Sequence, residues 1–286
     1  MAAWFFTLNH IATKEFVKDT DPTYLSYAQI LFLVVVSIPF TILLWHKFIF
    51  NWQFLLGSSI GGIITVIAQI LYMKSLKFGS IGKTVPLLSI SPIFTIPFAY
   101  LIIGELPGLI GISGIIIIII GAYILNLESF TYKNFFLPFI SIIKNKGSRF
   151  MFYVALFFAF GAVLDKFVIT NTNIYTRIGF FAYFTIIPFT LYLIIKERKK
   201  FGRKTKEIIK QKYLGLFILI VITFVEVVMN VIALSLTFTA YFIALKRASA
   251  LFSVIIAYFM FKERDYFLHH ILGTILIIAG VILLVL

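Results

Sequence analysis

Long apolar runs alternate with short polar connections along the whole chain. Each run suits a helix that crosses a membrane, because about 20 apolar residues cover a hydrocarbon core ~30 Å thick. Runs such as Ile115–Ile120 show no alternation of polarity, so we expect helices and not the strands of a barrel. The fold class is therefore an all-α membrane protein of ten transmembrane helices. The predicted spans are residues 2–17, 24–45, 53–75, 81–103, 107–127, 150–170, 175–195, 213–235, 239–261 and 267–286.

The apolar pattern is duplicated. Residues 68–105 align without a gap on residues 226–263, and each segment is almost uncharged and ends in a glutamate. Five spans per copy is an odd number, so the second copy enters the membrane from the opposite side. This predicts two inverted five-helix repeats, residues 1–127 and 150–286, joined by a linker over 128–149. We expect a central cavity lined by the third, fourth, eighth and ninth spans, with the first and sixth.

Glycines and prolines recur at corresponding places in the two halves. A Pro-Phe pair lies in the second span of each half, and two glycines seven residues apart lie in each fifth span. Small residues on one helical face let a neighbouring backbone approach closely, so we interpret the glycines as packing positions. The matching positions are Pro39-Phe40 and Pro188-Phe189, and Gly114/Gly121 and Gly273/Gly280.

Composition agrees with a membrane protein. The chain is 61% hydrophobic and 13% charged, whereas soluble domains carry about 25% charged residues. The net charge is +14, and half of it comes from Lys196–Lys212, which has nine Lys/Arg against two Glu. Between two spans, such a segment is a topology signal that contacts anionic lipid head groups, and not a nucleic-acid site. We predict that residues 196–212 are cytoplasmic.

Several kinds of chemistry have no signature in the sequence. The chain has no cysteine, so disulfides, thiolate nucleophiles and cysteine metal sites are excluded. Phosphate-binding loops, zinc-binding helices and nucleophile elbows are missing, and the first residues lack the basic region of a cleavable signal peptide. We expect neither an enzyme nor ATP-driven transport, and no cofactor or metal.

One ordered set of motifs carries a family resemblance. Lys74-Ser75-Leu76-Lys77 is followed by the segment PLLSISP over 86–92, by Gly104-Glu105 and by a glycine-rich apolar span. This set, present in a ten-span chain with two similar halves, resembles the EamA-type drug/metabolite transporters. The resemblance implies a secondary carrier of small metabolites in a prokaryotic plasma membrane, with its cavity between the halves. The distribution of basic loops predicts that both termini lie outside the cytoplasm, whereas the resemblance implies the opposite orientation.

The ninth span differs from the fourth at one place. Where the fourth span has Leu88-Ser89, the ninth has Lys246-Arg247. A charge within a span costs about 2.5 to 3.5 kcal/mol on insertion scales, so these cations face a cavity or a partner. The placement resembles the sugar-phosphate translocators of the same superfamily, in which a Lys-Arg pair holds the substrate phosphate. We predict that Lys246 or Arg247 binds an anionic group of the substrate, or that both pair with carboxylates of the protein.

Other polar residues within the spans are candidates for the same site. Glu226 and Asn230 lie one helical turn apart in the eighth span, on one face. Glu226 is either the structural partner of Lys246 or Arg247, or a proton-coupling group that exchanges this partner. Asp165-Lys166 and Lys14-Glu15 are either internal ion pairs or interfacial charges, and Lys166 is the better cavity candidate. Polar groups at mid-depth that form helix-to-helix hydrogen bonds or contact substrate are Asn9, His10 and Gln69.

Gate positions are expected in the fourth span and at the ends of matching spans. Pro86, Pro92 and Pro97 interrupt one helix and allow a bend that acts as a hinge or serves packing alone. Glu105 and Glu263 end the fourth and ninth spans and are expected to make packing or gate contacts.

These observations predict a secondary transporter that moves a small organic solute by alternating access. The cations favour an anionic or zwitterionic solute, either phosphorylated, carboxylated or an amino acid. Alternatives are a flippase or carrier for an anionic lipid phosphate, and a membrane scaffold without transport activity. We expect membrane lipid and a small-molecule substrate as partners, protons as a coupling ion, no nucleic acid, and a monomer or weak homodimer.

Overall fold

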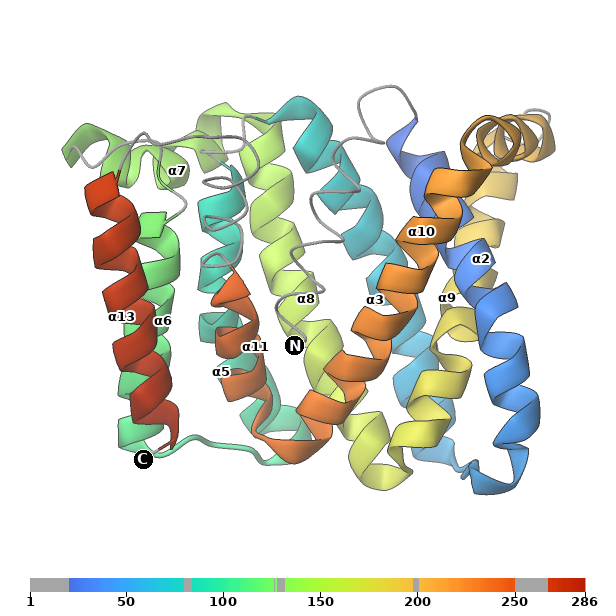
Figure 1. Ribbon diagram of the computed structural model, residues 1–286, viewed down its shortest axis with the longest axis horizontal. Coiled ribbons are helices and arrows are strands. Elements are labelled where there is room, and N and C mark those ends of the chain that lie inside the picture. The colour runs from blue at the N-terminus through green and yellow to red at the C-terminus, as the bar shows by residue number, and fades with distance from the viewer. Residues whose placement is uncertain are drawn as a thin grey trace.

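The computed structural model describes residues 21–79, 84–125, 127, 132–197, 201–249 and 267–285. These residues form helices, most of which stand side by side, while α7 lies across the upper ends of α6 and α13 (Figure 1). The first half holds α2 (Pro22–Leu43), η1 (Trp45–Lys47), α3 (Trp52–Phe78), η2 (Val85–Ile90), α5 (Ser91–Ile103) and α6 (Leu109–Leu125). After α7 (Tyr132–Lys144) come α8 (Lys146–Asn171), α9 (Ile174–Glu197), α10 (Phe201–Leu236), α11 (Thr239–Arg247) and α13 (Phe267–Val285).

Among the residues that the structure describes, six helical segments are long and apolar enough to cross a membrane. They are α2, α3, the segment Pro86–Ile103, α8, α9 and the part of α10 over Leu219–Leu236. Three shorter apolar helices occur in the described part of the chain: α6, the part of α7 over Phe135–Lys144 and the part of α13 over Ile271–Leu284. Of these, α6 and α13 stand beside the longer segments (Figure 1). The protein is therefore an integral, multi-pass membrane protein. The predicted first span and the second part of the predicted ninth span lie outside the described residues.

Glycines allow the fifth and tenth predicted spans, α6 and α13, to pack closely. A Cβ added at Gly121 would lie 2.8 Å from the carbonyl oxygen of Gly273, and one added at Gly280 would lie 2.8 Å from that of Gly114. Such distances leave no room for a side chain. The pairing of residue 121 with 273 and of 114 with 280 also shows that the two helices are antiparallel. The glycines are thus packing positions, as the sequence predicts.

The fourth predicted span is interrupted, as its prolines indicate. It begins as the 3₁₀ helix η2, with Pro86 in its first turn, and continues as α5, with Pro92 in its first turn and Pro97 in its interior. Leu87, Leu88, Ser89 and Ser91 are all buried. Irregular backbone at membrane depth is tolerated where protein covers it, and this segment meets that condition.

The polar segments between spans are more helical than the sequence analysis expects. The linker contains α7, and α8 begins at Lys146 and not at residue 150. The basic stretch is also helical from Phe201, because it forms the first turns of the 36-residue helix α10. Lys and Glu favour helix, and an ion pair of 2.7 Å from Lys204 Nζ to Glu197 Oε2 docks this segment on α9.

The pairs of helices in contact define the interior. α3 packs against α8 and α9, α10 packs against α2 and α9, α11 packs against α5, and α2 packs against α9. The largest apolar cluster joins buried side chains of α2, α3, η2, α8, α9 and α10. The outer faces carry exposed side chains such as Leu101, Leu109 and Ile195, which is expected of a surface that contacts lipid.

Candidate functional site

A cavity of about 240 Å³ lies between α2, α3, α8, α9, α10 and α11. The third, sixth, eighth and ninth predicted spans line it, as the sequence analysis expects. The second and seventh spans, α2 and α9, line it as well, which was not expected. The fourth span supplies none of the described lining residues, and the first span lies outside the described part of the chain.

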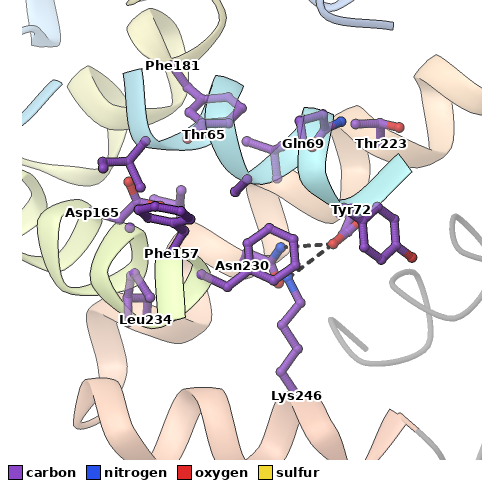
Figure 2. A pocket seen from close by; sticks show the side chains of 18 of the residues that line it. Thr65, Gln69, Tyr72, Phe157, Asp165, Phe181, Thr223, Asn230, Leu234 and Lys246 are labelled. Atoms are coloured by element: carbon purple, nitrogen blue, oxygen red, sulfur yellow. Dashed lines mark hydrogen bonds and ion pairs between the residues drawn. The ribbon is translucent and has the colours of Figure 1, made fainter. Parts of the chain in front are cut away.

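Glu226 of α10 organises one part of the cavity. Its Oε1 accepts hydrogen bonds from Lys246 Nζ of α11 and from Asn230 Nδ2 of α10, each at 3.2 Å. The Glu226 side chain is 10% exposed and the Lys246 side chain 17%, so this ion pair is largely shielded from solvent. Figure 2 shows Lys246 reaching from its helix toward Asn230, and dashed lines join both to the same carboxylate. Sequence spacing placed Glu226 and Asn230 on one face, and of the two cations expected as partners of Glu226 the structure brings Lys246 to its Oε1.

Arg247 links the cavity to the interrupted fourth span. Its guanidinium is buried, and its Nε donates a hydrogen bond of 2.8 Å to Ser91 Oγ at the start of α5. Arg247 and the neighbouring Tyr72 of α3 both line the cavity. The first half of the chain therefore holds the guanidinium of the second half in place.

A second ion pair joins α8 and α9. Arg177 donates to Asp165 Oδ1 through both Nε and Nη2, and its guanidinium carbon lies 4.3 Å from the centre of the Phe181 ring. The Arg177 side chain is 7% exposed and the Asp165 side chain 31%. Asp165 also interacts electrostatically with Lys246. Sequence reasoning missed Arg177, because a cation three residues inside a predicted span resembles an interfacial charge.

The formal charges of the residues that line the cavity do not sum to zero. Among the described residues, Lys246, Arg247 and Arg177 give three positive charges, and Glu226 and Asp165 give two negative charges. The formal sum is +1. An anion that enters this cavity therefore neutralises it, whereas a cation raises its charge further.

Aromatic and uncharged polar side chains complete the lining. Phe157, Phe158 and Phe242 provide apolar surface, and the amides of Gln29 and Gln69 provide donors and acceptors. Figure 2 shows Asp165 and Phe181 toward one side of the pocket, and Tyr72 and Thr223 toward the other. A few polar groups among apolar walls are typical of sites that bind small molecules.

Lys166 is not among the residues that line the cavity. Its Nζ donates to the carbonyl oxygens of Leu234 at 2.8 Å and Thr237 at 2.9 Å, and lies 3.5 Å from Glu105 Oε1. The other oxygen of Glu105 accepts from the amide of Thr239, the first residue of α11, at 2.7 Å. A cation thus faces the carbonyl end of α10 and a carboxylate faces the amide end of α11, which suits both helix dipoles. This cluster fixes the α10–α11 turn to α8 and to the end of α5.

The remaining sequence-predicted positions are distributed as follows. Gln69 lines the cavity, and Pro86, Pro92 and Pro97 lie in η2 and α5, outside its lining. Asn9, His10 and Glu263 lie outside the described residues.

Comparisons with known proteins agree with this architecture. The model of the EamA-like transporter family matches residues 1–127. A solved structure described only as the crystal structure of a protein is similar in fold, with a TM-score of 0.71 and 14% sequence identity, over 99% of this chain and 94% of that chain. No curated protein matches the sequence.

Proposed function

Because residues 1–127 match the model of the EamA-like transporter family, we propose that the protein is a secondary carrier of a small organic solute. It works by alternating access, and the solute is anionic or zwitterionic: phosphorylated, carboxylated or an amino acid. The observation that carries this proposal is the formal charge of +1 in the lining of the cavity. One negative charge on an anionic solute balances it, and an amino acid would place its carboxylate at the cations and its ammonium at Glu226.

The two cations of α11 suit an anionic group. Arg247 presents a planar fork that binds a carboxylate or phosphate through parallel hydrogen bonds, and Lys246 adds a compact charge. The bond from Arg247 Nε to Ser91 fixes one edge of that fork. A cation held in advance loses less side-chain entropy on binding, so preorganisation favours these residues as the anion site.

The size of the cavity favours a solute over a lipid. The volume of about 240 Å³ is close to the lower end of the range for sites that bind small molecules, about 300 to 1,000 Å³, so it favours a small metabolite. A flippase for an anionic lipid phosphate is the second candidate. It requires a cavity that opens toward lipid. A scaffold has no need of five charged side chains in a membrane interior, where each is costly.

Helix contacts support an arrangement of two inverted repeats, residues 1–127 and 150–286. The third span, α3, contacts the seventh span, α9. The equivalent contact with the halves exchanged is that of the eighth span, α10, with the second span, α2, and it is present as well. Equivalent spans also meet directly, since α2 packs on α9, α5 on α11 and α6 on α13. Inverted repeats are related by a pseudo-two-fold axis in the membrane plane, which makes equivalent helices antiparallel, as α6 and α13 are.

Glu226 is the proposed coupling site. It interacts with Lys246 in the absence of solute, and Lys246 is also within electrostatic range of Asp165. When an anion takes over Lys246, Glu226 loses part of the positive charge that balances it, and a proton can take the place of that charge. Solute binding and proton binding at Glu226 then support each other, which makes protons the proposed coupling ion.

The Glu105–Lys166 cluster is the proposed gate. It ties the first half, through Glu105, to the α10–α11 turn that carries Glu226 and Lys246 toward the cavity. Opening this end of the protein requires that the bonds to Leu234, Thr237 and Thr239 break together. The interrupted fourth span, with Pro86, Pro92 and Pro97, is the proposed hinge, because it ends at Glu105.

The basic segment gives the proposed orientation. The first turns of α10 lie at the same end of the molecule as α7, and the α10–α11 turn lies at the other end (Figure 1). Basic connections favour the cytoplasm, so we place residues 196–212 there and the Glu105–Lys166 cluster on the opposite side.

Exchange in proteoliposomes tests the function. The purified protein should exchange at least one of a phosphorylated, a carboxylated or an amino-acid solute, and should ignore neutral sugars. Lys246→Ala and Arg247→Ala should each weaken binding by about 1.5 to 3 kcal/mol, the range for a hydrogen bond to a charged group. Arg203→Ala is the matched control, because this cation is 73% exposed in the basic segment. Unchanged affinity in both α11 variants contradicts the proposal.

A further inference from the structure

A groove separate from the central cavity lies between α3 and α9. Its volume is about 310 Å³, and it is lined by Ile63, Val66, Ile67, Ile70, Leu71, Pro188 and Tyr192. Val66 and Ile70 are buried, whereas Ile63 and Ile67 are exposed on the outside of the protein. The opposite face of α3, with Ala68, Gln69 and Tyr72, lines the central cavity. The groove therefore opens toward the membrane lipid and not toward the transport site.

A glycine and a proline account for the position of the groove. Gly62 lets α3 approach α9 closely, because a Cβ added there would meet the carbonyl group of Phe184. Pro188 follows Phe184 by one turn and has no amide hydrogen, so that carbonyl oxygen loses its usual helical donor. The lining residues come after Gly62 in α3 and after Phe184 in α9. The groove thus begins beside this contact and follows both helices toward their C-terminal ends.

Each wall of the groove ends in a lysine. In α9, Lys196 lies one helical turn after Tyr192, and its Nζ lies 5.5 Å from the centre of the Tyr192 ring. In α3, Lys74 lies one turn after Ile70 and therefore on the same face of the helix. Lys196 is exposed and Lys74 is half-buried. Two accessible cations thus stand at the C-terminal end of an apolar groove.

These lysines lie where the two helices approach the membrane surface. α9 ends one residue after Lys196 and leads into the basic segment, and α3 ends four residues after its lysine. The neighbouring carboxylate of Glu197 accepts hydrogen bonds from Lys204 at 2.7 Å and from Tyr24 at 2.9 Å, so other groups engage it. At this level a bilayer presents lipid phosphates, with acyl chains beneath them. Basic pockets between spanning helices bind acidic lipid head groups on the cytoplasmic side.

We propose that the groove between α3 and α9 binds one anionic phospholipid. An acyl chain lies along the apolar walls, the phosphate contacts Lys196, and Lys74 attracts it from the facing wall. The match in charge selects this occupant, because a zwitterionic lipid carries a cation beside its phosphate, which the lysines repel. Two cations near the surface should favour an anionic lipid by roughly tenfold or more. The inference goes beyond the proposed carrier function and does not rest on it.

Native mass spectrometry of the purified, delipidated protein in detergent tests the head-group site. Dioleoyl phosphatidylglycerol and dioleoyl phosphatidylcholine have the same acyl chains and differ in the charge of the head group. The first phosphatidylglycerol should bind roughly tenfold or more tightly than the first phosphatidylcholine. Lys74→Gln combined with Lys196→Gln should bring this ratio to about one. The matched control, Lys206→Gln combined with Lys210→Gln, removes two exposed cations of the basic segment outside the groove and should keep the ratio.

A second pair of variants tests the groove itself. Ile67→Trp fills the groove and leaves both lysines in place, so it should abolish the tight binding of the first phosphatidylglycerol. Ile93→Trp adds the same bulk to an exposed isoleucine of α5, which does not line the groove. This control should bind phosphatidylglycerol as the wild-type protein does.

The inference is wrong if the wild-type protein binds the two lipids equally, or if both lysine-pair variants lose the preference to the same extent. It is also wrong if Ile67→Trp keeps the wild-type affinity for phosphatidylglycerol, or if a dimer of the chain forms in place of the lipid complex. The wild-type comparison decides the point even if a variant does not fold. Solute exchange plays no part in these measurements, so this inference and the proposed function can fail separately.

Discussion

The ion pair between Glu226 and Lys246 should hold α10 and α11 together as well as serve the site. The perturbation is a double-mutant cycle made of Glu226→Gln, Lys246→Met and the combined variant. The pair is 3.2 Å long, and its side chains are 10% and 17% exposed, so water screens it little. Removing one member of a buried pair costs about 3 to 5 kcal/mol, because the other charge stays in a poor environment.

The contacts around Glu226 predict a smaller loss of stability for Glu226→Gln. The glutamine oxygen still accepts from Asn230 and Lys246, and Asp165 still interacts with the Lys246 ammonium. We therefore expect a loss of about 3 kcal/mol in the free energy of unfolding, at the lower end of the range. Lys246→Met leaves the hydrogen bond from Asn230 to Glu226 in place, so its cost should be similar. The combined variant carries neither charge and should recover about 2 kcal/mol relative to the sum of the two single losses.

The assay is the unfolding equilibrium of the four proteins in mixed detergent micelles, together with exchange activity in proteoliposomes. The combined variant should lose less stability than the sum of the two single losses, and it should fail to accumulate solute on a proton gradient. If the single losses add within about 0.5 kcal/mol, the two side chains are not coupled and the reasoning from distance and burial is refuted. If the combined variant keeps its response to the proton gradient, Glu226 has a structural role alone.

Two further predictions concern packing and topology. Gly121→Val should lower the free energy of unfolding by about 1 to 3 kcal/mol, since its Cβ would lie 2.8 Å from the Gly273 oxygen. The control is Gly108→Ala, which has no atom within 4 Å of the added Cβ and should have little effect on the same unfolding curve. Equal losses in the two variants would show that α6 and α13 do not pack this closely. Because the chain has no cysteine, Lys206→Cys and Leu106→Cys report the two ends of the molecule directly. An impermeant thiol reagent should label residue 106 and not residue 206 in intact cells, and the reverse pattern would overturn the orientation.

The sequence alone determined the class of protein and much of its order. Apolar runs about as long as a membrane is thick, with few charges, permit only spanning helices, so composition and period are sufficient for that conclusion. The glycine spacing in α6 and α13 and the prolines of the fourth span act locally, through the absence of a side chain or of an amide proton. Their effects were therefore readable before any fold was known. The same holds for Glu226 and Asn230, which one helical turn brings to one face.

The tertiary structure decided the groups that assemble from different helices. Asp165 and Arg177 are separated by the turn between α8 and α9, and no spacing rule joins residues across a turn of unknown geometry. Adjacent residues on a helix point about 100° apart, so Asp165 lines the cavity while Lys166 reaches the carbonyl end of α10. Sequence reasoning could name both residues as unusual charges in a span, but it could not choose between them. That choice depends on how α8 is rotated about its axis, and packing against α3 and α5 fixes this rotation.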